Sequence, residues 1–445
     1  MILILSLAVW IFEPSSVDLI EERLIRGEEV VEFPSTLPYF KIAPASRTMF
    51  EQLPEVDPLS VRLYGGLDSL NMLRVNPLLN YSVTKNLMIR VSPFLTFGDD
   101  PAYPLPEWKA GIRGDFEEAG LVFDFDPLYF SLGRMRQRWG VTDHSLILSG
   151  WNYPFDQFGF RFERRPFLFS YFHGRLERLT GDSAFIPLYG DSLLSRYLVG
   201  HRIEARISRK VHLGFTETCL YVTPGGIDIS YLNPLLLYYE VQWNKEAWEG
   251  ESVDDNIVWS VDLRLDLPPT IYLELMLDDY QYEPSPDSEP NEIGFTVGIK
   301  YPVRGHTVFA EYTRLNNFCY NTQRPYLRYV YLGQSLGYYH GPDLDDLRVG
   351  VRLSFLPIGI DLVGMRHRKG EGRFDDPWPQ GYFPRPDFLT GVVEDDWGGE
   401  AGIRLTFRRL YLRLSGGIHR IENYHNRLGE EKILPVFSGQ LIFHP

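Results

Sequence analysis

The feature that most constrains the fold is a two-residue alternation of apolar and polar side chains, repeated along most of the chain. Between residues 256 and 267, for example, Val261 and Leu263 fall on one side of an extended segment, and Asp262 and Arg264 fall on the other. This period is that of a β-strand whose two faces meet different surroundings. The alternating segments often run for roughly 10 residues, near the ~9–11 that a tilted strand needs to cross a bilayer, whereas soluble strands are typically shorter.

The connections between these segments alternate between short turns and long, polar loops. Short turns are expected at residues 164–166, 208–210, 268–269, 302–305, 356–357 and 408–409. Long loops are expected at about 176–198, 223–255, 281–291, 316–345, 369–398 and 422–432. Outer-membrane barrels have this layout, with tight turns on the periplasmic side and longer loops outside.

Composition supports the same interpretation. Aromatic residues make up 15% of the 445 residues and charged residues 23%, a pairing that suits strands with one face in lipid and one in a polar lumen. We therefore predict an all-β protein, a transmembrane antiparallel β-barrel of about 16–18 strands in a bacterial outer membrane. The strand count before residue 158 is the least determined part. From residue 58 onward no helix is expected, and no apolar run is long enough for a helical membrane span.

The N-terminal part of the chain differs from the rest. Residues 1–13 contain a short apolar run and are interpreted as a signal peptide, although no basic residue precedes the run. Residues 14–56 are predicted to form a short helical segment, either periplasmic or plugging the lumen, with helices near 16–27 and 46–53. Residues 57–445 are assigned to the barrel.

Charge and cysteine content exclude several classes of protein. The net charge of −15 argues against nucleic acid as a partner, because nucleic-acid binders need a basic surface. The two cysteines, Cys219 and Cys319, are too few for a disulfide framework. A single disulfide and two free thiols both remain open, with free thiols favoured.

The chain carries no convincing catalytic or metal-binding motif. Ser145 and His144 are in principle a nucleophile and its base, but neighbouring residues on a strand point to opposite faces. The same holds for Asp278 and Asp279, and the ten histidines show no metalloprotease spacing. We expect no enzyme activity, no catalytic residue, no metal site and no cofactor.

Three arginines at alternate positions form the most suggestive polar cluster: Arg134, Arg136 and Arg138. They either bind anionic sugar or phosphate groups, or have a structural role as ion pairs in the lumen or as a rim that anchors lipid headgroups; the structural role is favoured. Gly133, just before them, is expected to mark a β-bulge that changes which face the following residues present.

Aromatic residues gather in the predicted loops, where flat rings suit the faces of sugars. The interfacial girdle of a barrel also uses Trp and Tyr, so each residue alone fits both roles. With the arginines, the candidate glycan-binding residues include the aromatics Trp139, Trp151, Tyr153, Trp243, Trp248, Trp378, Tyr382 and Trp397.

Several segments resemble the Wzi family of capsule assembly proteins. They are residues 17–24 (VDLIEERL), 44–47 (PASR), 129–134 (YFSLGR), 138–140 (RWG), 231–234 (YLNP), 256–262 (NIVWSVD) and 273–280 (LELMLDDY). The resemblance implies an 18-stranded barrel with a small helical plug that acts as a non-catalytic lectin for capsular polysaccharide. The family's sugar-contacting loop residues find no match by motif in this sequence.

Three functions are weighed from these observations. The leading hypothesis is a non-catalytic barrel that binds surface or capsular polysaccharide and helps its attachment or assembly. A porin or solute channel is the alternative, and an outer-membrane enzyme is the third. The expected partners are outer-membrane lipid, lipopolysaccharide and extracellular polysaccharide, with the barrel acting as a monomer.

Overall fold

The computed structural model describes residues 36–37, 59–66, 72–98, 107–109, 111–142, 144–179, 194–223, 226–249, 255–280, 290–355, 357–377, 388–407 and 410–443. Of the segments predicted at the N-terminus, residues 1–13 and most of 14–56 lie outside these ranges. Within them, Thr36–Leu37 forms the short strand β1.

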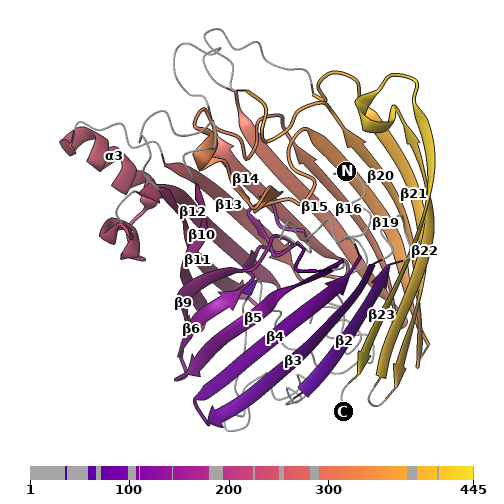
Figure 1. Ribbon diagram of the computed structural model, residues 1–445, viewed down its shortest axis with the longest axis horizontal. Coiled ribbons are helices and arrows are strands. Elements are labelled where there is room, and N and C mark those ends of the chain that lie inside the picture. The colour runs from indigo at the N-terminus through magenta and orange to yellow at the C-terminus, as the bar shows by residue number, and fades with distance from the viewer. Residues whose placement is uncertain are drawn as a thin grey trace.

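Eighteen strands form a closed antiparallel barrel (Figure 1), as the upper end of the prediction and the resemblance both required. They are β2 (Leu59–Gly66), β3 (Met72–Thr84), β4 (Leu87–Phe97), β5 (Ile112–Asp124), β6 (Leu128–Met135), β9 (Phe155–Arg164), β10 (Phe167–Leu179), β11 (Leu194–Ser208), β12 (Val211–Thr223), β13 (Asn256–Leu265), β14 (Thr270–Asp279), β15 (Glu292–Val303), β16 (His306–Leu315), β19 (Leu344–Phe355), β20 (Ile358–Lys369), β21 (Glu394–Phe407), β22 (Leu410–Glu422) and β23 (Glu431–Phe443). Strand β2 pairs with both β3 and β23, and this pairing closes the sheet.

The alternation of short turns and long loops is confirmed. Each predicted turn from residue 164 onward falls between two consecutive strands, and each predicted long loop joins the opposite ends of the next pair. The same alternation of the two ends extends backward to β2, in the region where the sequence left the number of strands open. We call the two rims the short-turn end and the long-loop end; the last barrel strand, β23, ends at the short-turn end, beside Leu410 (Figure 1).

The strand faces follow the predicted alternation. Val261 and Leu275 are cross-strand partners and are each about half exposed on the outer wall. Asp262 and Glu274, one residue along, are partners on the inner wall and are buried. The outer wall therefore carries an apolar band, and the inner wall carries the charge.

Charged side chains of the inner wall are paired with one another. Arg202 donates to both carboxylate oxygens of Asp262, at 2.6 and 3.0 Å. On the other side of the barrel, Arg404 lies 3.0 Å from Asp361. Pairing offsets part of the cost of removing these charges from water and fixes side chains in the lumen.

One prediction about helices is wrong. Residues 238–249, expected to be loop, form the α-helix α3 (Tyr238–Glu249), preceded by the 3-10 helix η1 (Ile229–Leu232). The sequence gives little sign of α3, because among its described side chains only Tyr238 and Val241 are buried and the helix depends on docking against the barrel. Among the described residues, no helix is long and apolar enough to cross a membrane.

The two cysteines are free thiols, as favoured. Cys219 packs with Tyr221 and Tyr231 on the outer wall, whereas Cys319 packs among loop residues in the lumen. The wall of the barrel separates them.

Candidate functional site

Two long loops fold inward and fill part of the lumen. We call them together the lumen plug: residues 136–154, between β6 and β9, and residues 316–343, between β16 and β19. The first contains the short strands β7 (Arg138–Trp139) and β8 (Leu148–Ser149); the second contains β17 (Val330–Tyr331), β18 (Gln334–Ser335) and the 3-10 helix η2 (Pro325–Leu327). Strand β1 pairs with β7, so the N-terminal segment reaches the plug at this point.

The plug is held by a buried apolar core that it shares with the inner wall. Loop residues such as Leu146, Ile147, Tyr320 and Tyr338 are fully buried in this core. The wall contributes side chains from β4, from β9 to β14, and from β16 and β19. Contact with so many strands fixes the plug as a rigid part of the barrel, in contrast to a loop lying over its mouth.

Glu274 of β14 is the main polar tie between the wall and the plug. Its carboxylate, fully buried, accepts hydrogen bonds from the Thr142 hydroxyl at 2.9 Å, the Ser145 hydroxyl at 2.7 Å and the Leu146 amide at 2.9 Å. A buried carboxylate needs several donors to offset its desolvation, and the plug supplies them.

The two plug loops are also joined to each other. The Tyr320 hydroxyl donates to the Leu146 carbonyl at 2.6 Å and accepts from the Tyr338 amide at 3.0 Å. The Ser149 amide donates to the Leu336 carbonyl at 3.2 Å. Opening the lumen therefore requires both loops to move together.

His144 and Ser145 do not form a nucleophile and base pair. Ser145 contacts Glu274, while the Nδ1 atom of His144 accepts a hydrogen bond from the indole of Trp151 at 2.9 Å. Both side chains hold the plug in shape.

Two of the predicted arginines form ion pairs, the alternative that the sequence favoured. Arg134 bonds Asp115 at 2.8 Å and Asp156 at 3.1 Å. Arg136 bonds Glu117 and donates to the carbonyl of Asn152 at 2.7 Å. The backbone of Arg138 pairs with Leu37 and Ser149 in the small sheet of the plug.

The expected bulge at Gly133 is absent, because the pairing with β5 and β9 continues through it without a shift. Instead, Gly133 has a φ of +136°, and a Cβ there would lie 2.2 Å from the Ala119 carbonyl oxygen. The glycine permits a close approach of two strands just before the arginines.

The predicted aromatic residues separate into different places. Trp139 and Tyr153 are buried in the plug, and Tyr153 donates to Asp115 at 2.9 Å. Trp243 and Trp248 both lie on α3, and of Trp248 only the backbone is described. Trp397 lies on the outer wall, half exposed, with the Arg366 guanidinium 4.5 Å from its ring centre. Trp378 and Tyr382 lie outside the described residues.

Trp151 belongs to a stack of rings that the sequence did not predict as a unit. Its ring lies 5.5 Å from that of His144 and 6.0 Å from that of Tyr339, and the series continues through His340 to His367. Trp151 and Tyr339 are only partly buried, whereas the side chain of His340 is 7% exposed. We call Trp151, His144, Tyr339 and His340 the ring stack. Its partly exposed members, Trp151 and Tyr339, offer flat apolar faces of a kind suited to a sugar ring.

Three residues beside the ring stack have donor atoms close enough for a metal ion. His340, Asp346 and His367 place one such atom each within 4.8 Å of the others. Asp346, however, already bonds His367 at 2.6 Å and accepts from the Tyr338 hydroxyl. The arrangement is that of a hydrogen-bonded cluster which joins the plug to β19 and β20.

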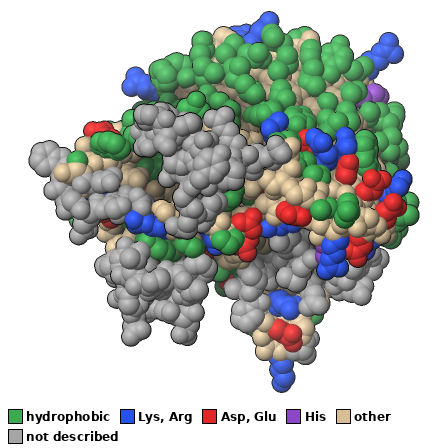
Figure 2. All heavy atoms as spheres, turned by 90° about the horizontal axis from the view of Figure 1, so that it is seen from above, with side chains coloured by type: hydrophobic (Ala, Val, Ile, Leu, Met, Phe, Trp, Pro, Cys, Tyr) green, Lys and Arg blue, Asp and Glu red, His purple; other side chains and the backbone are tan. Residues whose placement is uncertain are grey.

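The loops at the long-loop end are tied together into a rim. Asp343 accepts a hydrogen bond from the Gly372 amide at 2.8 Å, and Asn426 donates to the carbonyls of Lys369 and Val392 at 2.9 and 2.7 Å. Loops 316–343, 370–393 and 423–430 are therefore linked. Near the rim, Lys, Arg, Asp and Glu side chains gather in a strip beside the hydrophobic wall (Figure 2).

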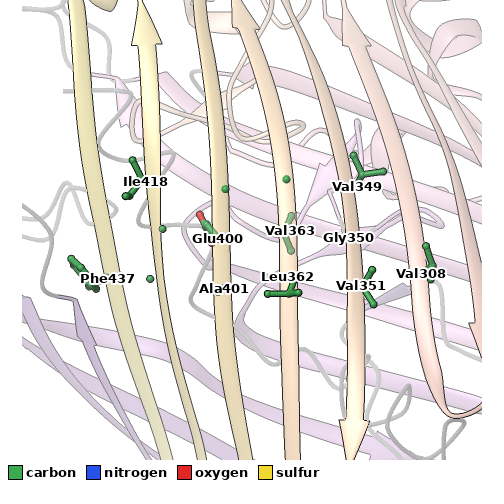
Figure 3. A pocket seen from close by; sticks show the side chains of 14 residues that line it. Val308, Val349, Gly350, Val351, Leu362, Val363, Glu400, Ala401, Ile418 and Phe437 are labelled. Atoms are coloured by element: carbon green, nitrogen blue, oxygen red, sulfur yellow. The ribbon is translucent and has the colours of Figure 1, made fainter.

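A groove of about 980 Å³ lies along β16 and β19 to β23, but it is not part of this site. The side chains that line it include Val308, Val349, Leu362, Ile418 and Phe437, all exposed on the outer wall (Figure 3). The groove lies in the apolar band and faces away from the lumen.

The closed barrel, the apolar outer wall and the long-loop rim define an outer-membrane β-barrel, and the comparisons with known proteins agree. Searches against protein-family models and curated protein sequences found no match. Among solved structures, the chain is similar to Wzi of Escherichia coli, an outer-membrane protein involved in group 1 capsule assembly and described as a carbohydrate-binding β-barrel. The TM-score is 0.66 at 12% identity, covering 98% of this chain and 99% of the other.

The chain is also similar to OprD of Pseudomonas aeruginosa, with a TM-score of 0.48 at 9% identity over 86% of this chain and 93% of the other. The likeness to Wzi, at 12% identity, establishes the fold. The resemblance to the Wzi family predicted from sequence motifs is thus confirmed for the fold, as is the location in the outer membrane.

Proposed function

We propose that this barrel binds a surface polysaccharide, in the role of a capsule-attachment or assembly protein, and that it is not an enzyme. The observation that carries the proposal is the lumen plug. Its loops share an apolar core with both sides of the inner wall, which disfavours free passage of solutes and favours a fixed surface for binding.

The ring stack supports a carbohydrate as the ligand. Trp151 and Tyr339 offer flat faces and partial exposure, and the buried imidazoles of His144 and His340 pack beside them. The Wzi barrel, which shares the fold, is described as carbohydrate-binding. A repeating polymer can bind through many weak contacts at once, so each site needs only modest affinity.

We also infer that the barrel works as a monomer surrounded by lipopolysaccharide. The pairs Arg366–Asp395 and Arg368–Asp345 lie on the outer wall next to the long-loop end, where the headgroups of the outer leaflet would be. Such a charged rim suits phosphate groups and the divalent ions that bridge them.

The test of polysaccharide binding compares two variants of the detergent-refolded full chain. Trp151→Ala removes a face of the ring stack, and we expect about a tenfold loss of affinity for surface-polysaccharide fragments, the equivalent of ~1.4 kcal/mol. Trp397→Ala removes an aromatic residue of similar size from the outer wall and should leave the affinity unchanged. Equal affinities for both variants and the parent would contradict a role for the ring stack.

The test of the plug is single-channel conductance of the parent protein in a planar bilayer. A plugged barrel should insert with negligible conductance. Insertion with a steady open conductance would instead favour the porin alternative, which the charged inner wall also suits.

A further inference from the structure

The loop between β12 and β13 folds outward over the wall of the barrel. We call residues 226–249, with η1 and α3, the outer flap; α3 extends from the side of the barrel (Figure 1). Outward side chains of β10, β11 and β12, among them Tyr171, Val199 and Cys219, form a buried cluster with Tyr231 and Tyr238 of the flap. This part of the outer wall is thus covered by protein.

A fully buried carboxylate fixes the flap to the wall. Glu217 of β12 accepts hydrogen bonds from the amides of Tyr238 and Tyr239, at 2.8 and 3.2 Å, at the first turn of α3. It also accepts from the Trp259 indole at 2.8 Å and lies 3.0 Å from His201. Without the flap, a carboxylate and a histidine would face hydrocarbon, so the docked position is the one a membrane permits.

The flap also carries a set of apolar side chains that the described residues leave uncovered. Seven large hydrophobic side chains, each 37–81% exposed, follow one another along it. They are Ile227, Ile229, Leu235, Leu236, Leu237, Tyr239 and Trp243. So much exposed apolar surface on one short segment marks a contact with another apolar phase.

The height of the flap on the barrel identifies that phase. The Tyr239 ring lies 5.5 Å from the ring of Trp259, whose strand partner is Leu277. After Leu277 the pairing of β14 with β15 shifts at Asp278 and Asp279, so the regular apolar face of β14 ends at this level. The uncovered side of the flap is continuous with the upper edge of the band, where Trp and Tyr of membrane proteins are enriched.

We propose that the outer flap is an interfacial anchor whose uncovered apolar side inserts into the outer leaflet of the membrane. Leu235, Leu236 and Leu237 would reach the acyl chains, and Trp243 and Tyr239 would lie at the headgroup boundary. The polar ion pair between Lys245 and Asp228 would remain at the aqueous edge. A segment with exposed apolar side chains and a polar edge can bind in the plane of the interface.

The test uses Trp243 as the reporter in the full-length protein reconstituted into phospholipid vesicles. The emission of Trp243 is the difference between the spectra of the parent and of Trp243→Phe. Some of the vesicles carry lipids brominated near the headgroup end of the chain. We expect these lipids to quench most of that emission, and aqueous iodide to quench little.

Two controls and two contrary outcomes complete the experiment. The emission of Trp397, obtained in the same way from Trp397→Phe, should be quenched by brominated lipid, because it lies on the outer wall; that of buried Trp139 should not. Strong quenching of Trp243 by iodide, with none by brominated lipid, would overturn the proposal. Quenching by neither, together with a dimer in detergent, would overturn it in favour of a second copy as the occupant.

Discussion

The lumen plug and the outer flap are made from loops of the same end of the barrel, but they fold to opposite sides of the wall. Each is tied to a strand by one fully buried glutamate: Glu274 receives the plug, and Glu217 receives the flap. The plug's tie lies in a lumen that already contains charge and can admit water. The flap's tie lies on a wall that otherwise meets lipid, so nothing can replace the flap's donors.

This difference suggests that the same interaction has different consequences on the two sides. Inside, loss of the carboxylate leaves donors that water can reach. On the outer wall, loss of the carboxylate leaves hydrogen-bond donors that face hydrocarbon and that water does not reach. Variants of the two glutamates and of the groups around them can separate the two cases.

The largest effect is expected from Glu217→Ala. Its loss leaves the Trp259 indole, His201 and two helix amides without their acceptor, at a cost of about 3 kcal/mol. Limited proteolysis of the membrane-reconstituted protein should show cleavage within residues 226–249, while the barrel persists. Glu217→Gln keeps one acceptor oxygen and should lose less; an uncleaved flap in the alanine variant would contradict the role of this carboxylate.

A smaller effect is expected from Glu274→Ala, about 2 kcal/mol, because water can enter the lumen and bond Thr142, Ser145 and Leu146. The plug should loosen, and single-channel recordings should show brief openings that are absent from the parent protein. A variant as quiet as the parent would mean that the apolar core alone holds the plug. The flap should resist protease as before, which separates the two modules.

Acidic pH should loosen the plug. Burial lowers the pKa of His340 well below its ordinary value, and His367 and His144 add to this, whereas Asp346 opposes it. The folded plug therefore binds this proton less readily than the unfolded chain. The contribution of neutral His340 to the stability of the plug is complete above about pH 6.5. It is lost below that pH, by up to about 1.4 kcal/mol per pH unit.

Recording channel openings between neutral and acidic pH checks this expectation. His340→Gln keeps a polar side chain without a titrating ring and should flatten the response. An identical pH dependence in the variant would assign the effect to other groups.

The smallest effect is expected from Tyr320→Phe. The variant keeps the buried ring but removes the hydroxyl that joins Leu146 to Tyr338, a loss of about 1 kcal/mol. Hydrogen exchange should accelerate at the Tyr338 amide, with little change at the amides bonded to Glu217. Unchanged exchange at Tyr338 would show that the Tyr320 hydroxyl does not protect this amide.

The sequence predicted the barrel wall well because the wall is periodic. Alternation assigned Asp262 to the lumen and Val261 to the outer side, and the turns fixed where each strand ends. These are local properties of the chain, and neighbouring strands reinforce them. The pairing of Arg134 and Arg136 with carboxylates was also favoured in advance.

The destination of each loop could not be predicted in the same way. Nothing local distinguishes Trp139, buried in the plug, from Trp397, on the outer wall. The helix α3 depends on Glu217, which lies on the strand β12 about twenty residues before the helix begins. No local pattern within α3 shows this contact. The ring stack joins residues from two loops nearly two hundred positions apart, so no spacing within either loop reveals it.

The two free cysteines can serve as reporters of motion on the two sides of the barrel wall. Cys219 lies beneath the flap and Cys319 within the plug, both without exposure. A thiol reagent can reach either sulfur only while the covering segment is displaced, so the labelling rate at each one reports how often that segment opens. A lipid-soluble reagent and a water-soluble one, applied to the unmodified protein, would therefore time the motions on the two sides of the wall independently.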